Sequence, residues 1–187
     1  MSNTAEVEQL MQAVRAIGYN AKREFGVLSK DQLNWKPAVD RWSVAQCFDH
    51  LITTNVAYFP IVESVAKGEK KTTFVERLPI VPKLWAKLFI KSLDPKTARK
   101  LKAPASFQPQ ASDLRECIID DFVDHQRIVA EAMDKTKQLN LERVVITSPA
   151  APVVTYSLMD AFRILVIHEQ RHFQQAKRVT EDSKFPK

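Results

Sequence analysis

The sequence predicts an all-α fold, a four-helix bundle whose long crossover carries an extra short helix. Four long segments show the apolar spacing of three and four residues that is typical of amphipathic helices. Only 3 of the 187 residues are glycine, which disfavours turn-rich β folds and glycine-rich phosphate loops. A chain of this length most simply buries one core, so residues 1–187 are expected to form a single helical-bundle domain.

Start and stop signals bound the first two helices. A first helix is expected over residues 4–27, and a connector follows over residues 30–41. Ser43 and Gln46 have the spacing of a capping box, in which each side chain satisfies a backbone N–H of the other residue. The second helix therefore begins there, and its apolar pattern continues beyond Pro60, where a kink is expected.

The expected crossover is the irregular segment 69–110, which contains five prolines. Residues 82–92 within it have the pattern of a short amphipathic helix, with lysines along one edge. We expect this helix to cover the bundle, and its Trp85–Phe89 face could pair with a second copy to form a homodimer.

Two further helices complete the expected bundle. The third spans residues 112–138, and a connector with a short extended piece at residues 144–146 follows it. Ser157, with Asp160 three residues later, starts the fourth helix, which continues to about Thr180. The tail that follows is expected to be frayed.

The positive charge is concentrated in residues 67–102, which contain eleven Lys or Arg residues and three acidic residues. A local basic segment is weaker support for nucleic-acid binding than a basic domain would be, so no nucleic-acid partner is expected. Cys47 and Cys117 form no disulfide framework, and the sequence shows no signal peptide and no apolar run of membrane-spanning length. These features favour a cytoplasmic protein without a membrane partner.

Histidine spacing is the strongest indication of chemistry. His168 and His172 lie four residues apart on an apolar helix, which places both imidazoles on one face. His50 lies beside the apolar face of the second helix. Neutral imidazoles bind divalent transition metals, and three of them leave at least one coordination position open. That position suits a water molecule, as metal-bound hydroxide, or a substrate thiol.

Neighbouring positions allow alternatives to this three-histidine site. Cys47 has the spacing of a further ligand to His50, although a helix cysteine is more often a small buried residue. His125 is either a fourth ligand or a salt-bridged histidine at a helix edge. Residues 168–172 also match the zinc-protease pattern, in which a third metal ligand follows further along the chain. The only glutamate after His172 is Glu181, which lies beyond the expected end of the helix. A protease is therefore disfavoured.

Small and polar side chains near the histidines leave room for a small-molecule substrate. The residues expected to line such a pocket are Gln46, Cys47, Thr54 and Gln175. Glu169 is a candidate base for hydrolysis, although it lies about 100° around the helix from His168. No residue is assigned a catalytic role from spacing alone.

Two stretches resemble one known family. The sequence from Leu33 through Trp35, Trp42 and Gln46 to His50 resembles the entry to the second helix of DinB-like (damage-inducible B) proteins. The run from residue 168 to 176, HEQRHFQQA, resembles the last helix of that family. The helix pattern agrees over nearly the whole chain.

The resemblance implies a metal site and a class of reaction. In this family one histidine of the second helix and two of the last helix bind a divalent metal, often zinc or nickel, and these positions are His50, His168 and His172 here. The family includes transferases and isomerases that use bacterial thiols such as bacillithiol or mycothiol. A metal-dependent thiol transferase is therefore the expected function. A hydrolase and a non-catalytic metal-binding or ligand-binding bundle are the alternatives.

Overall fold

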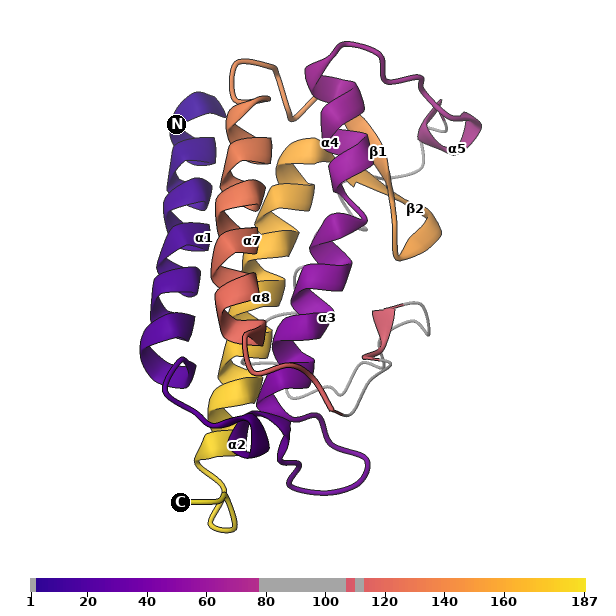
Figure 1. Cartoon of the computed structure of the whole chain (residues 1–187). Coiled ribbons are helices and arrows are strands. Elements are labelled where there is room, and N and C mark those ends of the chain that lie inside the picture. Colours follow the sequence, from indigo (N-terminus) through magenta and orange to yellow (C-terminus); the bar gives the residue numbers. More distant parts are fainter. Residues whose placement is uncertain (1–2, 78–106, 110–112) are drawn as a thin grey trace.

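The computed structural model describes residues 3–77, 107–109 and 113–187. Four long helices lie side by side along the long axis of the molecule (Figure 1). Helices α1 and α8 run in one direction, and α3 and α7 run in the other. Each of α1 and α3 packs against both α7 and α8. The bounds of the four helices are Asn3–Phe25 (α1), Val44–Val56 (α3), Ile118–Asp134 (α7) and Leu158–Thr180 (α8).

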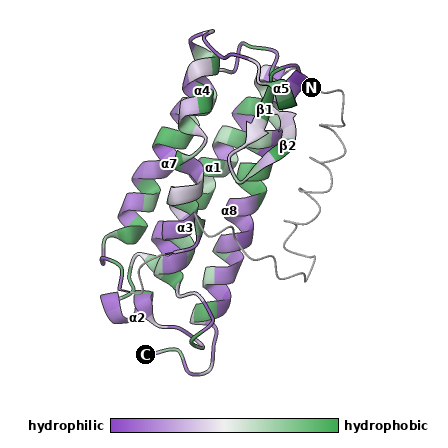
Figure 2. Ribbon diagram, turned by 90° about the vertical axis from the view of Figure 1, so that its right-hand side faces the viewer, coloured by the Kyte–Doolittle hydropathy of each residue, from purple (hydrophilic) through white to green (hydrophobic). Residues whose placement is uncertain are grey.

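The core lies between these helices and is formed by their apolar faces. Hydrophobic and hydrophilic bands alternate along each helix, as Figure 2 shows, which is the pattern that the sequence periodicity predicts. Phe48 of α3 has no exposed surface, and its ring centroid lies 5.3 Å from that of Phe25 and 4.8 Å from that of Phe122. This aromatic cluster joins α1, α3 and α7.

The start of α3 is the predicted capping box. The Ser43 hydroxyl accepts the backbone N–H of Gln46, and the Gln46 side-chain oxygen accepts the backbone N–H of Ser43, both at 3.2 Å. The kink expected at Pro60 is a complete break, because α3 ends at Val56 and α4 (Phe59–Ala66) begins after it. Proline has no N–H to donate to the carbonyl four residues earlier, so the helix cannot continue through this turn.

A two-stranded antiparallel sheet precedes α8. Strand β1 (Val145–Ser148) pairs with β2 (Ala151–Ser157), with an irregularity after Thr147. The sequence predicted only a short extended piece and missed the second strand, although residues 153–155 are all β-branched. The described residues are otherwise mainly helical, so the predicted all-α character is confirmed for most of them. Ser157 caps α8 as predicted, since its hydroxyl accepts the Asp160 N–H at 3.0 Å.

The third predicted helix was too long at both ends. Helix α7 begins six residues after the expected start and ends at Asp134. Asn34 explains the late start, because its side chain accepts the Leu114 N–H at 2.8 Å and donates to the Leu114 carbonyl at 2.9 Å. These two bonds satisfy the backbone of Leu114 outside a helix.

Two short helices lie in segments expected to be irregular. Within the predicted connector, α2 (Lys30–Asn34) begins with a second capping box, formed by Ser29 and Gln32. After α4, the short helix α5 (Phe74–Arg77) contacts the β1–β2 hairpin. The predicted amphipathic helix at residues 82–92 lies outside the described residues.

The expectation of a frayed tail was wrong. The ring of Phe185 packs edge-on against Trp35 at 5.5 Å between centroids, and the Gln32 side chain donates to the Pro186 carbonyl at 3.1 Å. Apolar contact together with a backbone hydrogen bond holds the tail on the α2 region. In the described part of the chain, no helix has the length and continuous apolar character needed to cross a bilayer.

Candidate metal centre

Three of the four histidines converge between α3 and α8. His50 comes from α3, and His168 and His172 come from α8. One ligand atom from each residue lies within 4.8 Å of the other two. Nε2 of His50 is 3.1 Å from Nε2 of His168, and the ring centroids are 4.6–5.0 Å apart. The convergence on which the metal hypothesis depends is therefore present.

The separation of the His50 and His168 nitrogens fits two ligands of one divalent ion, and one ligand atom of His172 lies within 4.8 Å of both. Zinc–imidazole bonds of about 2.0–2.1 Å in tetrahedral geometry place neighbouring ligand nitrogens about 3.3 Å apart, close to the 3.1 Å between His50 and His168. Nδ1 of His172 is buried without a hydrogen-bond partner, a state that bound metal or water commonly relieves. Among the described residues, no Cys, Asp, Glu or further His joins the group, so a bound ion would keep an open position.

Burial keeps the three imidazoles neutral. Burial, followed by the charges of His50 and Arg171, lowers the pKa of His168 to about 3. The pKa of His172 also lies well below its ordinary value, mainly because of burial and then because of the other two histidines and Arg171. Burial lowers the pKa of His50, and a hydrogen bond with Phe107 partly opposes that shift. Neutral imidazoles have the lone pairs that a metal ion requires.

Backbone and aromatic neighbours fix the orientation of His50. Its Nδ1–H donates to the Phe107 carbonyl at 2.6 Å, which leaves the Nε2 lone pair directed toward His168. Trp42, which is half-buried, packs against two of the three rings. Its ring centroid lies 4.9 Å from that of His50 and 5.5 Å from that of His172, stacked on the latter at 20°.

The residues expected to line a substrate pocket have different environments. The Gln46 side chain belongs to the α3 capping box, and the Thr54 hydroxyl donates to the His50 carbonyl at 2.7 Å. A hydrogen bond with Gln175 raises the pKa of His172 against the larger lowering effect of burial. Cys47 lies in the hydrophobic core with no exposed surface, and burial raises the pKa of its thiol. Its side chain thus packs in the core, and the pocket role of all four residues stays a prediction.

A comparison with protein families matches one family over most of the chain. The model of the DinB superfamily matches residues 19–176, a span that includes all three converging histidines. The chain belongs to the DinB superfamily. Neither a curated protein nor a solved structure gave a match. The family resemblance indicated by residues 33–50 and 168–176 is thus confirmed over most of the chain.

Beside the histidines, this DinB-superfamily protein contains a polar layer that spacing did not reveal. Glu169 is fully buried, and its Oε1 accepts the side-chain N–H groups of Asn55 at 2.8 Å and of Gln126 at 3.0 Å. Burial raises the pKa of Glu169 to about 7. The available signal was that Asn55 and Gln126 interrupt the apolar faces of their helices. Because Glu169 faces these two amides and lies outside the histidine group, its suggested role as a hydrolytic base loses support.

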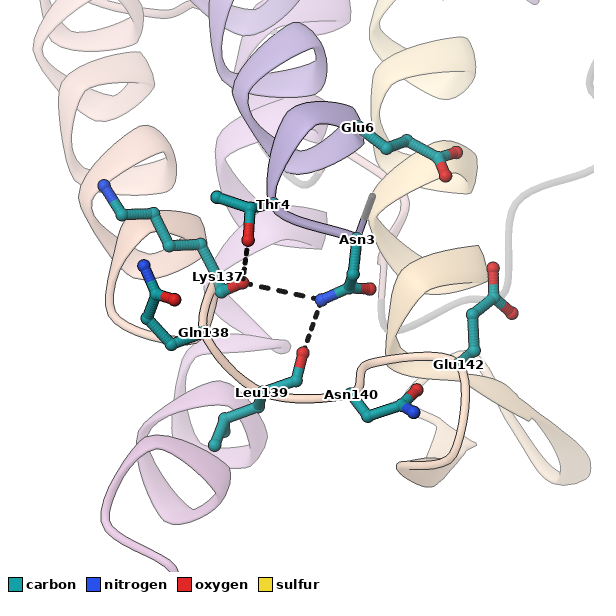
Figure 3. A pocket seen from close by; sticks show the side chains of 8 residues that line it. All are labelled: Asn3, Thr4, Glu6, Lys137, Gln138, Leu139, Asn140 and Glu142. Carbon is teal, nitrogen blue, oxygen red and sulfur yellow. Dashed lines mark hydrogen bonds between the residues drawn. The ribbon is translucent and has the colours of Figure 1, made fainter. Parts of the chain in front are cut away.

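Two cavities of about 290 and 310 Å³ lie elsewhere in the described structure. The smaller one, in Figure 3, is at the start of α1, where Asn3 donates to the carbonyls of Lys137 and Leu139 and Thr4 donates to the former at 3.3 Å. The second lies between Phe25 and Asp120. None of the three histidines lines either cavity, so neither is the substrate pocket expected beside the metal centre.

His125, the fourth histidine, matches neither interpretation offered by the sequence. It is buried outside the metal-ligand group, 5.4 Å from the ring of Phe59, and its Nε2 has no hydrogen-bond partner. Burial lowers its pKa to about 4. The ordinary value of 6.5 applies to the unfolded chain, so the unfolded state takes up a proton first as the pH falls.

His125→Leu should therefore make the protein less sensitive to acid. The stability that the neutral His125 ring contributes is present above pH 6.5 and is lost as the pH falls through 4. When the pH is lowered from 6.5 to 4, the wild type should lose about 3 kcal/mol more of its free energy of unfolding than the variant does. Urea denaturation of both proteins at the two pH values measures this difference. Equal losses would show that His125 does not titrate as its burial requires.

Proposed function

We propose that the protein is a divalent-metal-dependent enzyme that transfers a low-molecular-weight thiol to an electrophilic substrate. The observation that supports this proposal is the convergence of His50, His168 and His172 from two helices on one point. Zinc or nickel is the expected ion, because both accept imidazole ligands. The thiol chemistry is the chemistry that the family resemblance implies.

The architecture suits such a centre. We further propose that the four long helices form the four-helix bundle expected for the superfamily, with the segment between α4 and α7 as its crossover. Ligands on facing helices of a bundle core are a common way to build a metal site. The ion would lower the pKa of a thiol bound at its open position, so that the thiolate forms at neutral pH.

Several residues of the chain would support this chemistry without holding the ion. The Phe107 carbonyl fixes the tautomer of His50 by accepting its Nδ1–H. Trp42 covers His50 and His172 with an apolar ring and reduces the access of water to them. Arg171 places positive charge near His168 and His172, which opposes their protonation and favours an anionic thiolate nearby.

An assay with and without thiol tests the proposal. The zinc-loaded or nickel-loaded protein is mixed with a fluorogenic alkylating electrophile, in the presence or absence of a reduced bacterial thiol. We expect conjugation to require both the metal and the thiol, since the thiol supplies the nucleophile. The metal-free protein and the loaded His168→Ala variant serve as controls.

The other outcomes identify the alternatives. A rate of ester or amide cleavage that depends on the metal but not on the thiol would indicate a hydrolase and contradict the transferase proposal. A metal-loaded protein that accelerates neither reaction would favour a binding module without turnover.

A further inference from the structure

The buried layer of Asn55, Gln126 and Glu169 lies in the part of the core that carries the histidines. Its three side chains are 0–2% exposed. Asn55 follows His50 by five residues on α3, and Glu169 is adjacent to His168 on α8. The hydrogen bond between Asn55 and Glu169 therefore joins the same two helices that the histidine group joins.

The layer also reaches the other two long helices. Gln126 of α7 donates to the same Oε1 atom of Glu169 at 3.0 Å. Gly18 of α1 lies close to Gln126, because a Cβ atom added at Gly18 would be 3.2 Å from the Cγ atom of Gln126. The Oε1 atom of Glu169 on α8 thus accepts hydrogen bonds from α3 and α7. Helix α1 lies against the α7 donor, Gln126.

A buried carboxylate is a costly way to hold helices together. Within the described residues, Glu169 has no ion-pair partner, and its Oε2 has no hydrogen-bond partner. Apolar residues of similar volume often give equal or greater stability than a buried charged group. Apolar contacts are non-directional, whereas a hydrogen bond is lost when the donor and acceptor move apart by less than an ångström.

A metal centre built from two helices needs that directional precision. Ligand distances must be correct within about 0.2 Å, and a small slide or rotation of α8 would move His168 and His172 away from His50. We propose that Glu169 is a positioning residue that holds α8 against α3 through Asn55, with Gln126 tying it to α7, in the register at which the three histidines meet. This inference rests on the proposed metal centre.

Substitutions that separate hydrogen bonding from packing test the inference, with Co(II) alone as the probe. Glu169→Gln keeps an acceptor oxygen, so its Co(II) dissociation constant should stay within about threefold of the wild-type value. The triple variant Asn55→Leu, Gln126→Leu, Glu169→Leu replaces the layer with apolar side chains. It should bind Co(II) at least about tenfold more weakly, as removal of residues that orient metal ligands commonly does, and the visible absorption of bound Co(II) should change.

Thermal unfolding of the metal-free proteins separates positioning from a general loss of structure. We expect the triple variant to bind Co(II) more weakly than the wild type even if its melting temperature equals or exceeds that of the wild type. A triple variant that binds Co(II) within threefold of wild type, with the same absorption, would overturn it. Glu169→Gln binding as weakly as the triple variant would also overturn it, because charge rather than hydrogen bonding would then be required.

Two single variants keep the inference testable if the triple variant does not fold. Asn55→Leu breaks the link between the helices that carry the histidines, whereas Gln126→Leu leaves that link intact. Asn55→Leu should weaken Co(II) binding more than Gln126→Leu does, and equal effects would contradict the inference. A wild-type protein that binds no Co(II) would instead refute the metal centre itself, and the inference with it.

Discussion

His168→Ala should reduce the affinity for zinc or nickel by at least about 100-fold. Altering a residue that only orients a metal ligand commonly reduces the metal affinity about 10- to 100-fold. His168→Ala removes one of the three ligand atoms themselves, so its effect should be at least as large. His168 provides the nitrogen that lies 3.1 Å from the Nε2 of His50, so its loss leaves His50 without its nearest partner. His50→Ala and His172→Ala should have effects of the same size.

The fourth histidine provides a matched control for this prediction. His125 is also a buried helix histidine, but it lies outside the metal-ligand group, so His125→Ala should keep the wild-type affinity. Competition with a chromophoric chelator measures the dissociation constant of each variant. Full metal content in His168→Ala, or equal losses in both variants, would show that the three histidines do not form the site.

Phe48→Ala should lower the free energy of unfolding by about 4 kcal/mol, because truncation of a buried phenylalanine removes hydrophobic surface and leaves a cavity. Phe48 has no exposed surface and contacts the rings of Phe25 and Phe122. The substitution lies two residues before His50 on the same helix, so a displaced α3 should also weaken metal binding.

An exposed position on the same helix controls for the substitution itself. Val56 is 48% exposed, and Val56→Ala should change the free energy of unfolding by less than about 0.5 kcal/mol. Urea denaturation of the metal-free proteins measures both changes. A loss below about 1.5 kcal/mol for Phe48→Ala would show that the aromatic cluster is not the centre of the core.

The elements predicted correctly are those set by local chemistry. The capping signals at Ser43 and Ser157 placed the starts of α3 and α8 correctly, because a cap depends on residues only three positions apart. The late start of α7 depends on Asn34, about 80 residues earlier, and no local pattern contains that contact. The packed tail likewise depends on Trp35, far away in the sequence.

The candidate site was predictable to the same extent. The pair His168 and His172 follows from helical spacing, and His50 was a third candidate from its place beside the apolar face of its helix. The family resemblance then implied the same three ligand positions. Spacing could not show that the Phe107 carbonyl meets His50, because this contact joins residues 57 positions apart. The environment of Glu169 was also hidden, since its two donors come from α3 and α7. Patterns identify residues of suitable chemistry, and tertiary packing decides which of them meet.

Elemental analysis of the protein, purified without added metal or chelator, tests the central claim most directly. If His50, His168 and His172 hold one ion, the protein should contain close to one equivalent of a single divalent transition metal per chain. After removal by a chelator, the same metal should rebind with that stoichiometry. A protein that contains less than about a tenth of an equivalent, and binds neither zinc nor nickel at micromolar concentration, would contradict the metal centre.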